Sequence, residues 1–588
     1  MANIMSLSGL KNHPSRDAYD MGMRRAFTAK VGEYLPVYMR AVLPGDKWKN
    51  HTSWITRTQP VNTAAYTSFR EYYDWYFVPL RLLWRSFPDF ITQMDEDSVA
   101  RSLTSPISQI KGAPIFSSSD LERYIDALRP KNMNDYTENG GYDASDSVGK
   151  YDIMGYERCN QVAKLLDLLG YGNWTYRQFV NDITDTEQRT PMLGSHTVTS
   201  LSPFPLAAYQ KIYQDYLRDS LWEKRAPETY NFDYIVDNPV ISLSTLYTTS
   251  ALSKYTPNLF DIRYANWNKD LFMGVMPSPQ FGSESVAAPL MGNQRVDFGR
   301  VNPVDPSDLT KGFKADLITY PDKSTTIGLG LPVMALRQAE FLQKWKEIAQ
   351  SGRTDYKAQM QKHWNVDVPD VLSNRCTYIG GTSSTLNIGE VVNTNLADSD
   401  SDADIAGKGY NTGDGFCDFT AKEHGIIMCI YHCIPLLEYT SDGLCREATM
   451  VSPTDWPIPE FDRVGMESVP LARVAYGKTF NLDKFLGYAP RYIDFKTSVD
   501  LISGEFKFSL SHWVAGLSAK DLVALMMRYQ SSGVDGPMYA FFKVNPRVCD
   551  SIFAVSASYG GTSTDQLLCR ALLDIKLVRN LDRTGLPY

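Results

Sequence analysis

The chain has 588 residues, 43% hydrophobic and 21% charged, which is long enough for several ordinary domains or for one core enlarged by insertions. Its formal net charge of −8 argues against a protein that binds polyanions over its whole surface, so any nucleic-acid contact must be local. Eight cysteines are too few for a disulfide scaffold.

The N-terminus has no apolar signal core, and no apolar run reaches the ~18 residues of a membrane helix. We therefore expect a protein that is made in a cytoplasm and has no membrane partner. Residues 1–30 show no lasting period and carry more basic than acidic side chains. This segment is either a mobile terminus or an arm that docks or faces DNA, with candidate nucleic-acid contacts at Lys11, Arg16, Arg24 and Arg25.

Three extended runs follow the arm. Residues 34–43 are rich in β-branched and aromatic side chains and end at a Pro-Gly-Asp turn, residues 47–58 alternate apolar and polar side chains, and residues 72–78 end at Pro79. This order of strands and turns is typical of the start of an antiparallel β-sandwich. Further strands are expected from Gly415 onward, and one of them is a long apolar run that ends near Leu437. We predict one domain, residues 31–588, with an eight-stranded antiparallel jelly roll as its core.

Helices and loops are expected as insertions between these strands. Apolar side chains at helical spacing predict helices at 119–129, 157–169, 206–217, 334–350 and 354–364, and a further helix opened by Ser518. Polar segments rich in Gly and Pro predict loops at 131–152 and 283–330. The insertions would then cover about 86–240 (helices and loops), 283–330 (a surface loop) and 334–364 (helices).

Several ordered blocks resemble the major capsid proteins of microviruses, the small single-stranded DNA phages, and in particular those of gokushovirus type. The first two are LPVYMRAVLPGDKW from Leu35 and FVPLRLLW from Phe77. Others are the Pro-x-Pro-Gln-x-Gly run that ends at Gly282, the helical block at 333–366 and the C-terminal strand region. The resemblance covers most of the chain outside 100–200, 283–330 and 394–414.

The resemblance implies a structural protein that assembles with copies of itself into a small icosahedral T=1 shell around a circular single-stranded DNA genome. It implies no enzymatic activity and no cofactor. Implied partners are the packaged DNA, the other phage structural proteins (scaffolding and pilot or minor proteins) and a receptor on the host surface. The chain would be assembled in the bacterial cytoplasm and end in the virion.

Residues 283–330 lie between blocks that match the family but match nothing themselves. In related phages an insertion in this part of the chain forms protrusions around the three-fold axes, which suggests a surface projection that faces a receptor. Its candidate residues are Arg295, Arg300, Lys311 and Lys314. The alternative is a strap that crosses a neighbouring subunit.

The sequence contains no strong motif for catalysis or for metal binding. His424 and His432 share one strand face about 26 Å apart, and Cys429 and Cys433 share the other about 13 Å apart, too far for zinc ligands near 2 Å. We therefore expect no metal site, and no nucleophile elbow or carboxylate pair indicates catalysis. The alternative function is a carbohydrate-binding or carbohydrate-cleaving jelly roll, since the chain is rich in aromatic residues and acidic. A third candidate, a soluble DNA-binding module, is weakened by the net charge.

Overall fold

The computed structural model describes most of the chain. The described residues form two compact units, a large one within Met1–Pro277 and Asp367–Tyr588 and a small one within Ser278–Val366. The described ranges are 15–61, 65–92, 112–128, 158–172, 200–235, 240–243, 246, 258–282, 297–303, 313–318, 333–392, 405–476, 485–517, 541–549, 552–553 and 565–583.

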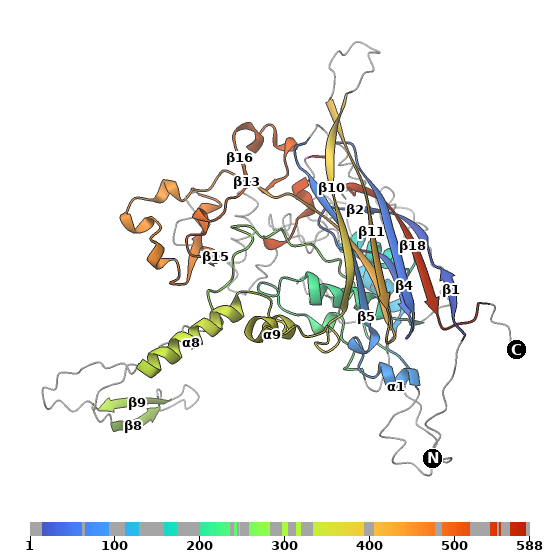
Figure 1. Cartoon of the computed structure of the whole chain (residues 1–588), viewed down its shortest axis with the longest axis horizontal. Helices are drawn as coiled ribbons and strands as arrows, with labels where there is room; N and C mark the ends of the chain where they lie inside the picture. Colours follow the sequence, from blue (N-terminus) through green and yellow to red (C-terminus); the bar gives the residue numbers. More distant parts are fainter. Residues whose placement is uncertain are drawn as a thin grey trace. The chain divides into compact units, whose positions relative to one another are not determined.

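The large unit is built on a nine-stranded sheet in the order β1-β18-β4-β11-β10-β5-β12-β3, with β2 also paired to β18. Every pairing in it is antiparallel. Figure 1 shows β11, β4, β18 and β1 side by side. The strands are β1 (Asp17–Asp20), β2 (Met23–Ala29), β3 (Leu35–Val42), β4 (Lys47–Thr58), β5 (Phe69–Pro79), β10 (Thr377–Val392), β11 (Ile405–Thr420), β12 (Gly425–Pro435) and β18 (Leu567–Arg579).

Strands β1 and β2 act as one edge strand. They pair with successive halves of β18, and between them the Met21 N–H still donates to the Ile575 carbonyl oxygen at 2.9 Å. Counting them once leaves eight strands in two layers: a front layer of β1/β2, β18, β4 and β11, and a back layer of β3, β12, β5 and β10. Strand β10 links the layers, because its first part pairs with β5 and its last part with β11. This confirms the predicted jelly roll.

Aromatic side chains from the two layers meet in the core. Ring centres of Trp48 in β4 and Trp75 in β5 lie 4.7 Å apart, and those of Trp54 and Tyr73 lie 4.5 Å apart. The strict alternation of buried and exposed residues along β4 follows from this packing, since one face meets the back layer and the other meets solvent. The sequence prediction for residues 47–58 is therefore confirmed.

Helices from the chain between β5 and β10 cover the back layer. Helix α6 packs on β5 and β12, and α5 packs on β3, so β12 is buried along its whole length. The predicted helices at 119–129, 157–169 and 206–217 are confirmed, the last one ending in a π-helical turn. The elements are η2 (Leu80–Leu82), α1 (Phe87–Thr92), β6 (Phe116–Ser117), α3 (Ser118–Leu128), α5 (Arg158–Leu168), β7 (Ser200–Leu201), α6 (Phe204–Ile212), η5 (Tyr213–Leu217) and η6 (Pro227–Thr229).

The small unit holds two helices and a hairpin. Helices α8 (Val333–Gln350) and α9 (Tyr356–Trp364) confirm the predicted pair, and α9 ends at Asn365, whose left-handed backbone (φ 54°) caps it. Within the segment predicted as a loop, β8 (Asp297–Pro303) and β9 (Phe313–Ile318) form an antiparallel hairpin. Strand β8 contains Gly299, next to an irregularity in its pairing between Phe298 and Val301, and ends at Pro303.

A second insertion lies between β12 and β18, where the sequence analysis placed strands of the jelly roll. It is made of short turns and small sheets, so the C-terminal strands of the core are fewer than expected. None of the described helices is long and apolar enough to cross a membrane. The elements are β13 (Glu438–Thr440), η8 (Glu447–Thr449), η9 (Pro453–Asp455), η10 (Pro459–Phe461), β14 (Met466–Pro470), η11 (Leu471–Arg473), β15 (Phe485–Pro490), η12 (Ile493–Phe495), β16 (Leu501–Ile502), η13 (Gly504–Lys507), η14 (Ser511–Trp513), β17 (Gly516–Leu517) and η16 (Pro546–Cys549).

Two further differences concern strands without a clear sequence signal. Residues 17–29, in the segment without a lasting period, form β1 and β2, and the alternation along β2 spans only seven residues. Strands β10 and β11 begin well before Gly415, where strands were expected to return. The predicted loop at 131–152 and the predicted helix opened by Ser518 lie outside the described residues.

Candidate nucleic-acid interface

The face of the front layer that points away from the core is exposed. Because strands alternate, every second residue of each strand lies on this face. We call it the basic sheet face and define it by Arg24, Ala26 and Thr28 of β2; Leu568, Arg570, Leu572, Asp574 and Lys576 of β18; Lys47, Lys49, His51, Ile55 and Arg57 of β4; and Tyr410, Thr412, Asp414, Phe416 and Asp418 of β11.

The strand register brings these side chains into rows across the sheet. Arg57 lies between Leu568 of β18 and Tyr410 of β11, and the next row places Arg570 beside Ile55. Arg24 of β2 lies opposite Leu572 of β18. Residues far apart in sequence therefore form one surface in which cationic and apolar side chains alternate.

The positive charge of this face is largely free. Arg24, Lys49, Arg57 and Arg570 form no ion pair with another residue in the described part of the chain. The Asp574 carboxylate is paired with the Lys576 ammonium at 3.0 Å. Asp20 accepts a hydrogen bond from the same ammonium at 2.8 Å, which raises the pKa of Lys576. Basic groups thus exceed free acidic groups on this face, although the whole chain has a net charge of −8.

Apolar and aromatic side chains complete the face. Phe416 is 70% exposed and Tyr410 is 56% exposed, both on β11. An open hollow of about 500 Å³ crosses β2, β18 and β4, with Ile55 and Leu568 in its lining and Arg57 and Arg570 beside them. Such a surface has cations for a phosphate backbone and flat or apolar groups for bases, and it shows no catalytic constellation.

The structure separates the four basic residues that the sequence grouped as nucleic-acid contacts. Arg24 lies on the basic sheet face, but Arg25 points to the opposite side of β2, where its Nη1 donates to the Val37 carbonyl oxygen at 3.1 Å. Burial lowers the pKa of Arg25. The Arg16 guanidinium donates to the Gly45 carbonyl oxygen, and Lys11 lies outside the described residues.

The candidate residues of the surface projection are only partly placed. Arg300 lies on β8 and Lys314 on β9, where Lys314 pairs with Asn302, and only the backbone of these strands is described. Arg295 and Lys311 lie outside the described residues.

Sequence reasoning missed most of the basic sheet face. The period-two pattern of residues 567–579 predicts a strand whose exposed positions include Arg570, and the pattern of β4 exposes Arg57. The pattern gives no information on which strands are neighbours. Only the fold shows that Arg24, Arg57 and Arg570 share one face.

The residues weighed as metal ligands are part of a packed aromatic core. The His432 ring stacks on Tyr72 at 4.6 Å, and its Nδ1 lies 3.9 Å from the Asp74 carboxylate. Burial lowers the pKa of His432 to about 3 and raises that of Asp74 to about 6. Cys429 and Cys433 are buried in the same strand. Within the described ranges, no group of His, Cys, Asp and Glu side chains is suited to hold a metal ion.

A jelly roll with large insertions between its strands is an architecture found among viral capsid proteins and also among lectin domains. The family model of the phage capsid protein (F protein) matches residues 10–127 and 189–522, more than half of the chain, and the chain belongs to this family. It is also similar to the capsid protein VP1 of Chlamydia phage 1, with 23% identity over 535 residues that cover 84% of each chain. The microvirus resemblance is thereby confirmed, and the role of the protein is structural: it is a component of the virion that builds a shell.

Proposed function

We propose that copies of this chain form a small icosahedral phage shell around a circular single-stranded DNA genome, and that the basic sheet face lines its interior. The observation that carries this proposal is the concentration of unpaired cations and exposed aromatic rings on one face of an acidic chain. Assembly would take place in the bacterial cytoplasm together with the scaffolding and pilot proteins of the phage.

The chemistry of the face suits a single strand better than a duplex. Its cations neutralise phosphates wherever the backbone passes, which makes binding independent of sequence and sensitive to salt. Bases that are not paired expose their flat faces, and Tyr410 and Phe416 offer rings on which they stack, typically for ~1–3 kcal/mol each. A genome of any sequence is thus accommodated.

The double substitution Arg57→Ala and Arg570→Ala tests this proposal. Both side chains are exposed, so the subunit keeps its stability within about 0.5 kcal/mol. We expect shells that form normally but hold less DNA. Each lost phosphate contact also lowers the slope of log affinity against log salt by about 0.7 on single-stranded DNA.

The matched control is Lys224→Ala, an exposed basic residue that follows η5 in the insertion over the back layer. This variant should bind and package DNA as the parent does. If the double variant keeps its DNA content and salt slope, or if Lys224→Ala lowers them equally, the basic sheet face does not line the genome.

We further propose that residues 283–330 take part in host attachment. Support comes from the compact small unit that contains them and from the β8–β9 hairpin within them. A hairpin in a unit separate from the core strands can bind a partner without disturbing those strands. Proteolysis of intact particles distinguishes this role from that of a strap between subunits.

A further inference from the structure

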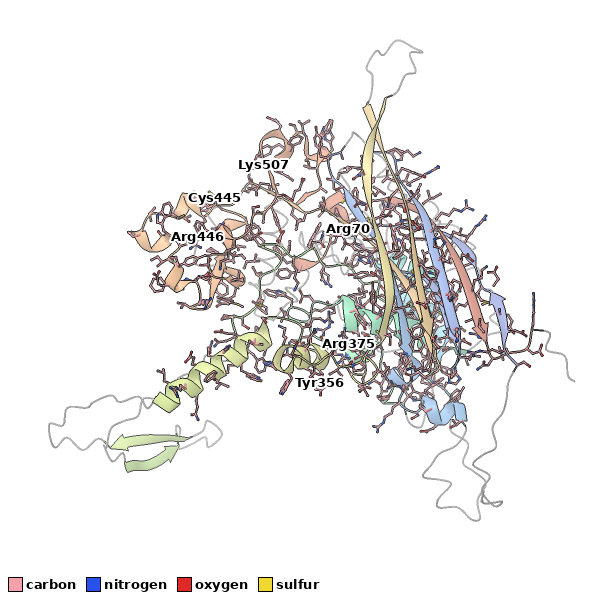
Figure 2. All side chains as sticks on the ribbon, viewed as in Figure 1. Arg70, Tyr356, Arg375, Cys445, Arg446 and Lys507 are labelled. Atoms are coloured by element: carbon pink, nitrogen blue, oxygen red, sulfur yellow. The ribbon has the colours of Figure 1, made fainter. Side chains whose placement is uncertain are left out.

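A lobe within residues 445–476 and 485–496, between β12 and β18, contains four charged side chains that are mostly covered and pair with one another. The Arg473 guanidinium makes two hydrogen bonds to the Asp494 carboxylate, one of them at 2.8 Å. The Arg446 Nη1 lies 3.3 Å from the Glu467 carboxylate, and all four groups are mostly covered. Figure 2 labels Arg446 and the neighbouring Cys445 on this lobe.

Large apolar side chains of the same lobe point outward. Val451 is 92% exposed, Val464 64% and Trp456 59%, and the two phenylalanines are nearly half exposed. The lobe also exposes charged side chains, among them Glu447, Glu460 and Arg463, so its surface is mixed rather than uniformly apolar. We call the five apolar residues the apolar lobe patch: Val451, Trp456, Phe461, Val464 and Phe495.

Local contacts join three of the five residues, Phe461, Val464 and Phe495. The Val464 N–H donates to the Phe461 carbonyl oxygen at 3.2 Å, which closes a turn around these two residues. The Lys496 Nζ donates to Asp462 and so joins the segment of Phe495 to that turn. The guanidinium of Arg491 lies 5.9 Å from the centre of the Phe461 ring.

The size of the patch suits a protein interface. A whole aromatic side chain offers about 150–250 Å², so the exposed parts of the five residues amount to roughly 500 Å² of apolar surface. This is close to the largest patch found on a typical monomer, and such patches are often functional. It is also more than half of the ~800 Å² that each partner contributes to a standard interface.

We infer that the apolar lobe patch is a contact between neighbouring copies of this chain. The inference rests on the proposed shell, in which every subunit is surrounded by identical copies. Exposed Trp and Phe beside Arg is the composition of an interface core. The partly covered groups Arg446, Arg473, Glu467 and Asp494 pair with one another and so are not part of this contact.

The substitution Val464→Glu tests the inference. In the free subunit the new carboxylate is in water, so the melting temperature should stay that of the parent. In a subunit contact the same carboxylate is buried without a partner, and we expect the fraction of chain that sediments as closed particles to fall at least tenfold. Trp456→Ala, which removes contact area without adding charge, should lower that fraction in the same direction.

Leu372→Glu is the matched control, because Leu372 is 73% exposed and lies outside both the apolar lobe patch and the basic sheet face. It should leave the particle fraction unchanged. If both lobe variants melt as the parent does and assemble as well, the patch is not a subunit contact. The same conclusion follows if they assemble normally and only infectivity falls, since the patch then binds another partner. A parent chain that never forms particles would instead overturn the proposed shell itself.

Discussion

Asp74 is a carboxylate enclosed by aromatic side chains. It lies on β5, its side chain is 16% exposed, and its Oδ1 accepts a hydrogen bond from the Tyr378 hydroxyl at 3.1 Å. Burial raises its pKa from 3.8 to about 6, whereas burial lowers the pKa of the neighbouring His432 from 6.5 to about 3. Both residues therefore favour their neutral forms in the folded protein.

These two shifts have opposite effects on stability. The folded state holds the proton of Asp74 more tightly than the unfolded state, so stability falls as pH rises from about 4 to 6. His432 binds a proton more weakly in the folded state than in the unfolded state. The free energy of unfolding therefore falls as pH drops from about 6.5 towards 3. In the window between pH 4 and 6 the two contributions partly cancel.

The substitution Asp74→Asn removes the first contribution and keeps the second. An amide keeps an acceptor for Tyr378 and carries no charge to bury, so the variant should be more stable than the parent at pH 8 by roughly 1–3 kcal/mol. The difference should vanish near pH 4, where the parent carboxyl is protonated. Urea unfolding of the unassembled subunit at both pH values measures it, and an equal difference at pH 4 and pH 8 would refute the titration of Asp74 as its cause.

At the scale of the strand, β11 shows why part of the jelly roll cannot be predicted from the residue pattern. Its core-facing positions include Gly407, Gly409, Gly413 and Gly415, so the apolar alternation typical of a strand is absent. Large side chains of the facing strands occupy the space. A Cβ on Gly413 would lie 2.2 Å from the indole ring of Trp54, and one on Gly415 would lie 2.5 Å from Thr382.

Gly413→Ala should therefore destabilise the subunit by about 1–3 kcal/mol, the usual effect of overpacking a core. Trp54 is 2% exposed and its ring centre lies 4.5 Å from that of Tyr73, so a shift of the indole ring would disturb the core. Gly389→Ala in β10 is the matched control, since its nearest neighbour would lie at 4.0 Å, and it should change stability by less than about 0.5 kcal/mol. Urea unfolding measures both variants, and equal effects would contradict the packing argument.

The same comparison shows what can be predicted from the sequence. Apolar residues recur at every second position in β4 and at helical spacing in α8. The bounds of both elements were therefore predicted to within one or two residues. Strand β11 lacks such a pattern, because glycines occupy core-facing positions where side chains of other strands, such as Trp54 and Thr382, fill the space. The basic sheet face was missed for a related reason: Arg24, Arg57 and Arg570 are brought together by strand order, which no local pattern contains.

At the scale of the whole molecule, limited proteolysis tests the placement of residues 283–330 in a shell. If they project outward, a protease should cut intact particles near Lys311 or Lys314 while the shells stay closed, because the segment is then in contact with solvent. Mass spectrometry of the fragments and sedimentation of the cut particles measure the two effects.

If these sites are cut only after the particles are disassembled, residues 283–330 do not project from the shell. The segment would then be a strap between subunits, and the contact with the receptor would lie elsewhere. Trypsin treatment of the unassembled subunit is the control, since the sites near Lys311 and Lys314 should be cut there in either case.

Strand β18 lies between β1/β2 and β4, so the last strand of the chain completes the layer that the first strands begin. Ribosomes add about 5–20 residues per second, and the N-terminal strands therefore wait roughly half a minute or longer for their partner. A nascent or prematurely terminated chain lacks β18 and Arg570 with it. Such a chain has neither a closed sandwich nor a complete basic sheet face, so we expect unfinished subunits to be excluded from the growing particle.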